Sequence, residues 1–399
     1  MKALWVLNAG SSSLKFALYP VEPDLAEQPA LAGQIEGIGT HPRLHARAAS
    51  GERFEASVPH PAGDDQDSHH QGALDFLLDW MKTHTPRLDL IGVGHRVVHG
   101  GAAHSAPVRL DAALLDELRQ FEPLAPLHQP HNLRAIRAVG RTMPALPQVA
   151  CFDTAFHRTQ PPLAQRFAIP RALHDEGVRR YGFHGLSYEY ISRHLAETIG
   201  PERAHGAVIV AHLGNGASMC AMRDGKSVAS SMGFTAIDGL MMGTRSGALD
   251  PGVLLYLMDR KGLDAAGLTR LLYKESGLLG VSGISADMRD LLASPAPEAR
   301  EAIDLFCYRA ARELGSLAAA AGGCDALVFT GGIGEHAAAV REGIVARSAW
   351  LGLALDADAN ARHAGRIDRA DSPVAIAVIP TNEEWMIARH ALDLIGRNA

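Results

Sequence analysis

Residues 4–19 have the sequence LWVLNAGSSSLKFALY, and this stretch decides the fold. An apolar run reaches Asn8, a turn of glycine and serine follows, and Lys15 opens a second apolar alternation. This pattern predicts two strands joined by a tight turn, which is a β-hairpin. Because Gly10 permits unusual backbone angles and serine is small, backbone N–H groups, hydroxyls and the Lys15 ammonium can converge on a phosphate. Asn8 ends the first strand, where its amide oxygen can hold a cation directly or through water.

A second stretch of the same design spans residues 207–222, AVIVAHLGNGASMCAM. A strand runs through His212 into a turn formed by Gly214, Asn215 and Gly216, and another alternating strand follows. A single glycine turn is more often an ordinary turn than a ligand loop, but a matched pair predicts a duplicated domain with a nucleotide between the copies. Neither stretch has the Gly-x-x-x-x-Gly-Lys-Ser/Thr spacing of a P-loop.

The bulk composition sets limits on the class of protein. The 399 residues suffice for two domains, and 47% apolar with 21% charged residues is typical of a globular protein. A net charge of −6 argues against a nucleic-acid partner but is compatible with a local basic pocket for an anionic substrate. Met1 leads directly into the first strand, so we expect no signal peptide, and no apolar run approaches the ~20 residues of a membrane span. None of the four cysteines is part of a C-x-x-C pair; they are Cys151, Cys220, Cys307 and Cys324. We therefore expect them to be reduced thiols in a cytosolic protein.

A further predicted strand, residues 91–101 with the sequence IGVGHRVVHGG, carries two histidines and an arginine. His95 and His99 have the spacing of half a zinc motif, but that motif needs a helix and an intervening glutamate, so we set zinc aside. Arg96 offers a planar fork for a carboxylate or phosphate, and a structural salt bridge is an equally good explanation of it.

Two more candidates follow in the first half of the chain. His128 lies between prolines in EPLAPLHQPHN, which fixes its loop. Asp153 follows the apolar run of a predicted strand, where α/β sheets place their ligands, although a helix N-cap is the alternative. Residues 59–72 are turn-formers and charges, which predicts a solvated loop containing His69 and His70 before a helix over 74–81.

Glycine-rich segments supply the candidates of the second half. Phe183 and His184 lie in a glycine turn before an amphipathic helix, and Arg245 stands alone in the glycine-rich stretch 238–252, which predicts a close-fitting ligand loop. A third glycine turn, in DALVFTGGIGEH, can carry a nucleoside against bare backbone. The last predicted strand brings Asn382 and Glu383 to its end.

The motifs NAGSSSLK, HRVVHGG, APLHQPH, FDTAFH, YGFHG, HLGNG, MGTRSG, ISADMR, TGGIGEH and PTNEE, in this order, resemble the acetate kinase family over nearly the whole chain. The resemblance implies an α/β fold with duplicated ribonuclease-H-like domains, that of the acetate and sugar kinase, heat-shock ATPase and actin superfamily. It implies an N-terminal lobe over residues 1–152, onto which the C-terminal helix 385–399 packs, a nucleotide-binding lobe over 153–384, and a cleft between the lobes. It also implies a homodimer.

Roles for individual residues follow from the same resemblance. Asn8 and Glu383 would hold Mg²⁺, with Mn²⁺ as the alternative, and Asp153 would be the catalytic acidic residue. His184 would support the phosphoryl group that is transferred. Acid binding would fall to Arg96, Val98, Leu127, His128, Phe183, Ala236 and, beside the acyl phosphate, Arg245. The ATP site would comprise Ser11, Ser13, Lys15, His212, Leu213, Gly214, Asn215, Gly216, Asp287, Met288, Arg289, Gly332, Ile333, Gly334, Glu335 and His336.

Three positions depart from the family's usual pattern. Ala236 stands where proline is usual, which widens the acid pocket and extends the expected substrates to propionate, a change worth ~1–3 kcal/mol of discrimination. Ala248 replaces the aspartate that usually follows MGTRSG, which removes a partner of the Arg245 loop. His336 replaces the usual asparagine and changes the contacts at the nucleotide's edge.

We therefore expect the reaction ATP + acetate ⇌ ADP + acetyl phosphate by in-line phosphoryl transfer. Its nucleophile is a carboxylate that is ionised at pH 7, so no general base is needed, and the protein must neutralise anionic oxygens with arginine, histidine and Mg²⁺. The alternatives are a propionate-preferring kinase of the same family and a non-catalytic nucleotide-binding module of the actin or chaperone type. An acid pocket lined by two arginines argues against the second alternative.

Overall fold

The computed structural model describes residues 1–10, 13–59, 66–85, 88–126 and 128–396. Contacts between residues divide the chain into two compact units. Unit 1 comprises Met1–Ala155 and Asn382–Ala399, and unit 2 comprises Phe156–Thr381. Asp153 and Glu383, which lie in the second lobe by the sequence-based boundaries, therefore belong to unit 1.

Unit 1 is built on an eight-stranded sheet with the order β5-β4-β3-β2-β1-β6-β8-β7. The strands are β1 (Lys2–Ala9), β2 (Ser13–Pro20), β3 (Leu31–Glu36), β4 (Arg43–Ala48), β5 (Arg53–Ser57), β6 (Asp89–Val97), β7 (Val108–Arg109) and β8 (Gln148–Phe152). The predicted hairpin is confirmed, because β1 and β2 pair antiparallel with Asn8 opposite Lys15. β1, β6 and β8 are mutually parallel neighbours, so their carboxyl ends meet at one edge of the sheet.

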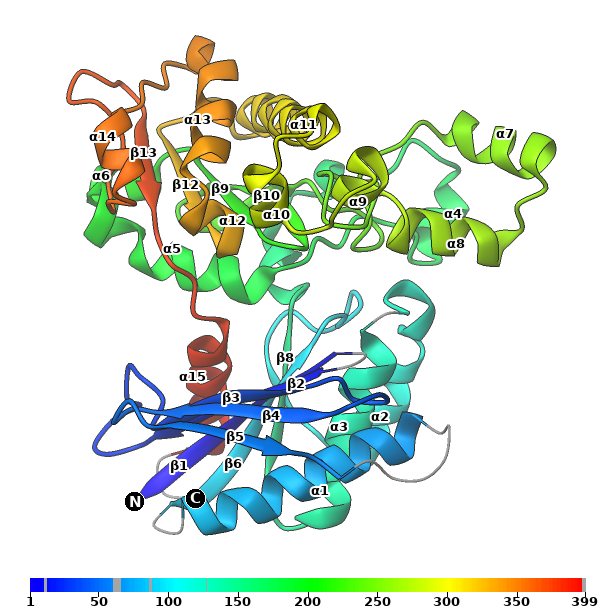
Figure 1. Ribbon diagram of the computed structural model, residues 1–399, viewed down its shortest axis with the longest axis vertical. Helices are drawn as coiled ribbons and strands as arrows, with labels where there is room; N and C mark the ends of the chain where they lie inside the picture. The colour runs from blue at the N-terminus through cyan, green and yellow to red at the C-terminus, as the bar shows by residue number, and fades with distance from the viewer. Residues whose placement is uncertain (11–12, 60–65, 86–87, 127, 397–399) are drawn as a thin grey trace. The chain divides into compact units, whose positions relative to one another are not determined.

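Helices cover this sheet on both faces (Figure 1). They are α1 (Gln66–His84), α2 (Ala112–Arg119), α3 (Gln129–Thr142) and α15 (Glu383–Ile395). α1 and α3 enclose one face in a core that contains Trp5, Phe16 and Leu77. On the other face α15 packs on β6, where Gly92 and Gly94 leave room for the side chains of α15 because a Cβ at either glycine would collide with them.

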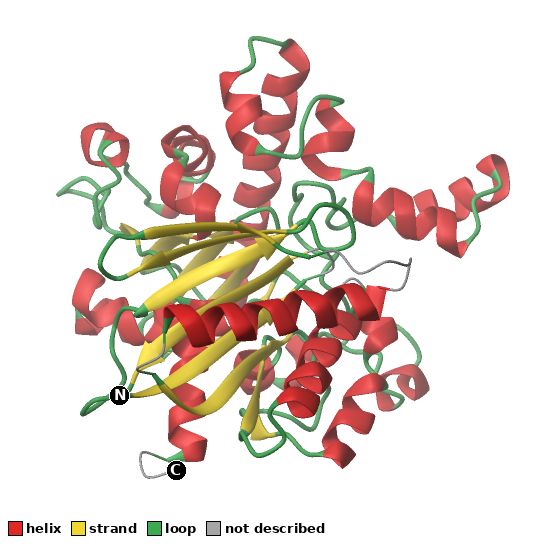
Figure 2. Ribbon diagram, turned by 60° about the horizontal axis from the view of Figure 1, so that its bottom comes forward, coloured by secondary structure: helices red, strands yellow, loops and turns green. Residues whose placement is uncertain are grey.

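Unit 2 repeats the central part of this topology. Its sheet has the order β11-β10-β9-β12-β13, formed by β9 (Val208–Leu213), β10 (Ala217–Arg223), β11 (Lys226–Ser230), β12 (Ala326–Thr330) and β13 (Ala375–Val378). The order and directions match β3-β2-β1-β6-β8 of unit 1: an antiparallel three-stranded meander followed by two parallel strands. Both sheets appear as yellow arrows in Figure 2. The duplicated α/β fold predicted from the paired hairpins is confirmed.

The helices of unit 2 are α4 (Arg171–Asp175), α5 (Gly185–Ile199), α6 (Pro201–His205), α7 (Pro251–Lys261), α8 (Ala265–Lys274), α9 (Gly277–Ser282), α10 (Met288–Ala293), α11 (Pro297–Ala321), α12 (Gly331–His336), α13 (Ala338–Arg347) and α14 (Ala357–Ala361). α5 buries Tyr188, Ile191 and Leu195 against β9 and β10, and α11 packs on β10 and β11. In the part of the chain that the structure describes, no helix combines the length and the apolarity needed to cross a bilayer.

One local prediction is wrong. α1 begins at Gln66, eight residues before the predicted helix, so His69 and His70 are buried helix residues and not part of a solvated loop. His70 Nε2 lies 3.0 Å from the carbonyl oxygen of Gly10, a contact between residues sixty positions apart that local composition does not reveal. The stretch between the first hairpin and Gly51 forms β3 and β4. Its polar composition does not indicate these strands in the sequence.

Candidate active site

The centre of the site in unit 1 is a pair formed by Arg96 and Asp153. Arg96 lies near the end of β6 and Asp153 directly after β8, and these strands are parallel neighbours, with Arg96 opposite Cys151. Arg96 donates from Nε to Asp153 Oδ1 at 3.1 Å and from Nη2 to Oδ2 at 2.6 Å. Asp153 is 1% exposed and Arg96 is 19% exposed, so this two-bond contact fixes the plane of the guanidinium. The alternative of a helix N-cap at Asp153 does not apply, because η2 begins at Ala155 and the carboxylate is engaged with Arg96.

A second carboxylate lies beside the same guanidinium. Glu383 Oε2 is 3.9 Å from Arg96 Nε, and Asn8 Oδ1 is 3.5 Å from Nη1, at the limit of hydrogen bonding. Burial alone lowers the pKa of Arg96, but the charges of Asp153 and Glu383 outweigh burial and hold that pKa above its ordinary value. Burial and the neighbouring charges of Asp153 and Glu384 raise the pKa of Glu383 to about 7, against the opposing effect of Arg96. One guanidinium therefore faces two carboxylates, and the cluster has surplus negative charge.

This cluster fits a divalent cation of the magnesium type. Its free oxygen donors are the Glu383 carboxylate and the Asn8 amide, whereas both Asp153 oxygens are taken by Arg96. Over the ranges that the structure describes, no group of three or more His, Cys, Asp or Glu side chains is placed to hold a metal. Mg²⁺ commonly keeps several waters and binds one or two carboxylates, which matches this sparse donor set, and a cation would offset the raised pKa of Glu383.

Polar side chains at the start of α3 fix the loop after β6. Asn132 Oδ1 accepts from the Val98 N–H at 3.1 Å, and Asn132 Nδ2 donates to the Ala9 carbonyl at 2.8 Å. Gln129 bonds both the N–H and the carbonyl of His99. Asn132 thus ties the end of β1 to the residue that follows β6. Sequence analysis missed both amides, although buried polar residues on the inner face of an amphipathic helix were the available signal.

Several predicted residues of unit 1 lie near this frame. Val98 is buried, and His128 stands at the N-cap position of α3, partly exposed. Ser13 and Lys15 lie on β2, and Lys15 points to the solvent face. Ser11 and Leu127 lie outside the described residues. His95 and His99 are buried, and burial lowers the pKa of each to about 4, so both are neutral imidazoles in the fold.

In unit 2 the site is organised around two stacked imidazoles. The rings of His184 and His212 are 4.4 Å apart at 24°. His184 Nδ1 lies 2.8 Å from Ser218 Oγ, and His212 Nδ1 lies 2.8 Å from Ser187 Oγ, so each ring is oriented by a serine hydroxyl. His184 has a left-handed backbone (φ 58°) directly before α5, which a residue adopts only when its surroundings fix it.

A buried histidine that sequence analysis missed supports the turn with Phe183 and His184. His157 Nε2 lies 2.8 Å from the Phe183 carbonyl, and its Nδ1 lies 2.9 Å from Ser227 Oγ. The His157 ring packs so closely against Gly182 (φ 77°) that a Cβ there would collide with it. Burial lowers the pKa of His157 to about 4. The imidazole of His157 is therefore neutral, and it supports the turn by packing on Gly182 and contacting the Phe183 carbonyl.

Arg245 lies close to His184 above the turn of the second hairpin. A Cβ at Gly216 would be 3.4 Å from His184 Nε2 and 3.8 Å from Arg245 Nη1. The imidazole of His184 and the guanidinium of Arg245 therefore both lie beside this glycine. Arg245 Nη1 also donates to the Ala236 carbonyl at 2.8 Å. The structure thus brings together four predicted residues of unit 2, which are His184, His212, Gly216 and Arg245. Ala236 contributes its backbone carbonyl.

A cavity of about 570 Å³ in unit 2 is lined by the turn with Gly214 and Asn215, by the start of α10 and by α12. Its lining contains eight of the predicted ATP-site residues: Gly214, Asn215, Asp287, Met288, Arg289, Gly332, Ile333 and His336. Asp287 caps α10 and holds Arg289 by a two-bond ion pair at 2.6 and 3.1 Å. His212, Leu213, Gly216, Gly334 and Glu335 are not among the lining residues.

The prediction of a third glycine turn is wrong, because residues 331–336 form the short helix α12. Glu335 and Arg341 support this helix. Glu335 Oε1 accepts from the Gly331 N–H at 3.0 Å. Arg341 is fully buried and donates from Nη1 to the carbonyls of Gly334 and Glu335, at 2.8 Å each. These carbonyls end α12, so the guanidinium satisfies groups that a helix C-terminus leaves unpaired. Arg341 is a further residue that sequence analysis missed.

Known proteins resemble this chain over nearly its whole length. The family model described as the acetokinase family matches residues 3–389. An acetate kinase of Rhodopseudomonas palustris is 55% identical over 391 residues, 97% of either chain. A crystal structure of a propionate kinase from Francisella tularensis has a TM-score of 0.90 at 38% identity, covering 98% of this chain and 100% of that one. The acetate kinase of Porphyromonas gingivalis gives 0.87 at 37% identity, with 99% and 100% covered.

Proposed function

The chain belongs to the acetokinase family, and we propose that it transfers the γ-phosphoryl group of ATP to acetate, reversibly, giving ADP and acetyl phosphate. One observation carries the assignment within the structure: Asp153 holds Arg96 rigidly by two bonds from Nε and Nη2, while Nη1 makes only a contact of 3.5 Å with Asn8 Oδ1. An acid that must approach an anionic phosphate needs such a fixed positive group.

The chemistry is an in-line displacement. A carboxylate oxygen of acetate forms a bond to the γ-phosphorus as the bond from that phosphorus to the bridging oxygen breaks, and ADP leaves with the electron pair. Acetate is ionised at neutral pH, so no residue needs to remove a proton. We propose that Arg96, Arg245 and His184 stabilise the charge on the transferred group, and that Asp153 acts by orienting Arg96.

Mg²⁺, or Mn²⁺ in its place, is part of this proposal. The Glu383 carboxylate and the Asn8 amide would hold it, and the ion would supply charge neutralisation for the phosphate oxygens. The surplus negative charge at Glu383 supports this role.

We propose that unit 1 is the lobe that holds the acid and the metal, and that unit 2 is the nucleotide lobe. The cavity lined by Asp287, Arg289 and Ile333 supports the second assignment, because it offers an apolar floor and exposed backbone to a nucleoside. Ser13 and Lys15 would contact phosphate from the first hairpin. Val98 and His128 would contact the acid from unit 1.

The test is the turnover of Arg96→Ala, measured as acetyl hydroxamate formed from acetate and ATP. We expect turnover about 100-fold or more below that of the unchanged protein, because one fixed donor to the developing charge is lost. Arg389→Ala is the matched control, since Arg389 also pairs with carboxylates in unit 1 but at 29% exposure. Near-normal acetyl phosphate formation by the Arg96→Ala variant would overturn the role assigned to Arg96. If the unchanged protein itself forms no acetyl phosphate, the non-catalytic nucleotide-binding module is the better explanation.

Propionate is the second candidate substrate. It is favoured by the structural match to the Francisella tularensis propionate kinase and by alanine at position 236. The relative kcat/KM for acetate and propionate decides between them.

We also propose a homodimer and a cytoplasmic location. On α7 the apolar side chains of Leu255, Tyr256 and Met258 are 50–68% exposed, which supports an interface there. All four cysteines are free thiols, which supports a reducing compartment.

A further inference from the structure

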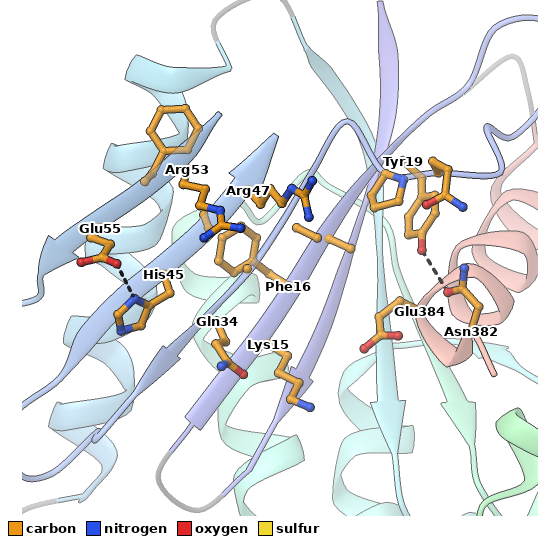
Figure 3. A pocket seen from close by; sticks show the side chains of 17 residues that line it. Lys15, Phe16, Tyr19, Gln34, His45, Arg47, Arg53, Glu55, Asn382 and Glu384 are labelled. Atoms are coloured by element: carbon orange, nitrogen blue, oxygen red, sulfur yellow. Dashed lines mark hydrogen bonds and ion pairs between the residues drawn. The ribbon is translucent and has the colours of Figure 1, made fainter. Parts of the chain in front are cut away.

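A hollow of about 690 Å³ lies on the sheet of unit 1, on the face that carries α15 (Figure 3). α15 packs on β6, β1, β8 and β2, and the hollow extends from its first turn across β2, β3, β4 and β5. Tyr19 and Asn382, joined by a hydrogen bond of 3.2 Å, form one wall. The volume is in the range of sites for small organic ligands.

The floor of the hollow follows from the register of the strands. Ala17, Ala32, Arg47 and Arg53 form one cross-strand row, because each is the pairing partner of the next. The two alanines leave depth in the middle of the sheet, and the two arginines stand side by side at its outer end. Figure 3 shows both guanidinium groups over the same part of the hollow.

Two like charges directly opposite each other on neighbouring strands destabilise a sheet. Neither Arg47 nor Arg53 has an ion pair or side-chain hydrogen bond with any residue that the structure describes. Of the two carboxylates in the lining, Glu55 lies 3.7 Å from His45, and Glu384 lies in the first turn of α15. Neither carboxylate forms an ion pair with Arg47 or Arg53, so the arginine end of the hollow has unbalanced positive charge.

We propose that this hollow binds a phosphate-bearing small molecule, with the phosphate between Arg47 and Arg53. Two planar forks can each give a pair of parallel N–H bonds to phosphate oxygens, and the anion removes the repulsion between them. Gln34, Tyr19 and Asn382 offer hydrogen-bonding groups to the rest of the ligand over the small side chains of the floor. The proposal does not depend on the proposed function, because none of the residues that hold the phosphate belongs to the candidate active site.

The test is isothermal titration of the full chain with orthophosphate and, separately, with ribose 5-phosphate, using ribose as the blank. In Arg47→Ala/Arg53→Ala we expect the affinity of one binding event to fall about 10-fold for each arginine removed. Arg47→Lys/Arg53→Lys keeps the charge but not the fork and should fall between the two. Arg43→Ala is the control, because Arg43 lies on β4 outside the lining, and it should bind as the unchanged chain does.

Any phosphate binding at the candidate active site is the same in the double alanine variant and in the unchanged chain. The difference between their two isotherms therefore reports on the hollow alone. Tighter binding of ribose 5-phosphate than of orthophosphate identifies a phosphate ester as the ligand, and equal binding identifies free phosphate. Identical isotherms for the unchanged chain and the double alanine variant overturn the proposal, as does an equal loss in Arg43→Ala. Turnover of acetate by the double variant should be unchanged, which separates failure here from failure of the kinase assignment.

Discussion

Asp153→Asn is the sharpest test of the site in unit 1. The substitution keeps the shape of the side chain and removes its charge. In the protein Asp153 is 1% exposed and accepts two bonds from Arg96, at 3.1 and 2.6 Å. An amide can accept one of these bonds, but its NH₂ group then faces the other guanidinium N–H.

The structure gives the size of the effect. Charge-assisted hydrogen bonds contribute about 1.5–3 kcal/mol each, and breaking a buried ion pair by removing one partner costs about 3–5 kcal/mol. We expect the free energy of unfolding at pH 7 to fall by about 2–4 kcal/mol. If Asp153 acts by orienting Arg96, kcat should fall about 100-fold, which corresponds to about 2.7 kcal/mol.

The substitution also predicts a change in the pH dependence of stability. Glu383 has a folded-state pKa of about 7, above its ordinary value, so the folded state keeps a proton that the unfolded chain releases. Its contribution to stability is therefore present at low pH and is lost as the pH rises toward 7, by about 3 kcal/mol. Because the charge of Asp153 is one cause of the raised pKa, this loss should be smaller in Asp153→Asn.

The assays are urea unfolding at pH 5 and pH 8 and hydroxamate kinetics at pH 7. Asp393→Asn is the matched control, since its carboxylate pairs with Arg389 at 3.2 Å but is 51% exposed. An exposed pair contributes about 0–1 kcal/mol, so this control should change neither stability nor turnover appreciably. An Asp153→Asn protein with normal kcat would refute the role of the pair in orienting Arg96, and an unchanged stability difference between pH 5 and pH 8 would refute the coupling to Glu383.

Four further predictions concern other parts of the molecule. The pKa of His157 is lowered to about 4, so its stabilising effect is complete at pH 7 and is lost as the pH falls below about 6.5; in His157→Gln the stability difference between pH 7 and pH 5, from urea titrations, should shrink by about 2 kcal/mol. Ala236→Pro should raise the acetate-to-propionate ratio of kcat/KM about 10-fold, and an unchanged ratio would show that this position does not set specificity. Leu255→Glu should shift the mass measured by light scattering from dimer to monomer, because it places a charge on the exposed apolar face of α7. Arg341→Met should raise the KM for ATP more than that for acetate and lower the free energy of unfolding by about 2–4 kcal/mol, since the carbonyls that end α12 lose their donor.

Much of the fold is visible in the sequence because its decisive elements are local. The two hairpins combine an apolar alternation with a glycine turn, and the long helix α11 ends at Ala321, directly before Gly322. α2 begins after the N-cap residue Asp111, whose side chain accepts from the Leu114 N–H at 2.8 Å. In each case neighbouring residues along the chain carry the signal.

Contacts between distant segments are harder to predict. The sequence places Arg96 and Asp153 at strand ends, but only the order of β6 and β8 in the sheet makes them partners. β4 has the sequence RLHARA, whose outward residues are charged, so its alternation is masked by a polar composition. The hollow with Arg47 and Arg53 was therefore not predictable, since β3 and β4, which lie between β2 and β5, were not recognised.

The return of the chain to unit 1 has a consequence for biosynthesis. Unit 2 is one continuous segment, whereas unit 1 needs its last eighteen residues before α15 can cover Gly92 and Gly94 of β6. During synthesis, unit 2 can therefore complete its fold before unit 1 does. Until translation ends, one face of the sheet that contains the first hairpin is not covered by α15. Removal of residues 382–399 should accordingly yield an aggregating product, since it leaves apolar surface of β1 and β6 without its helix.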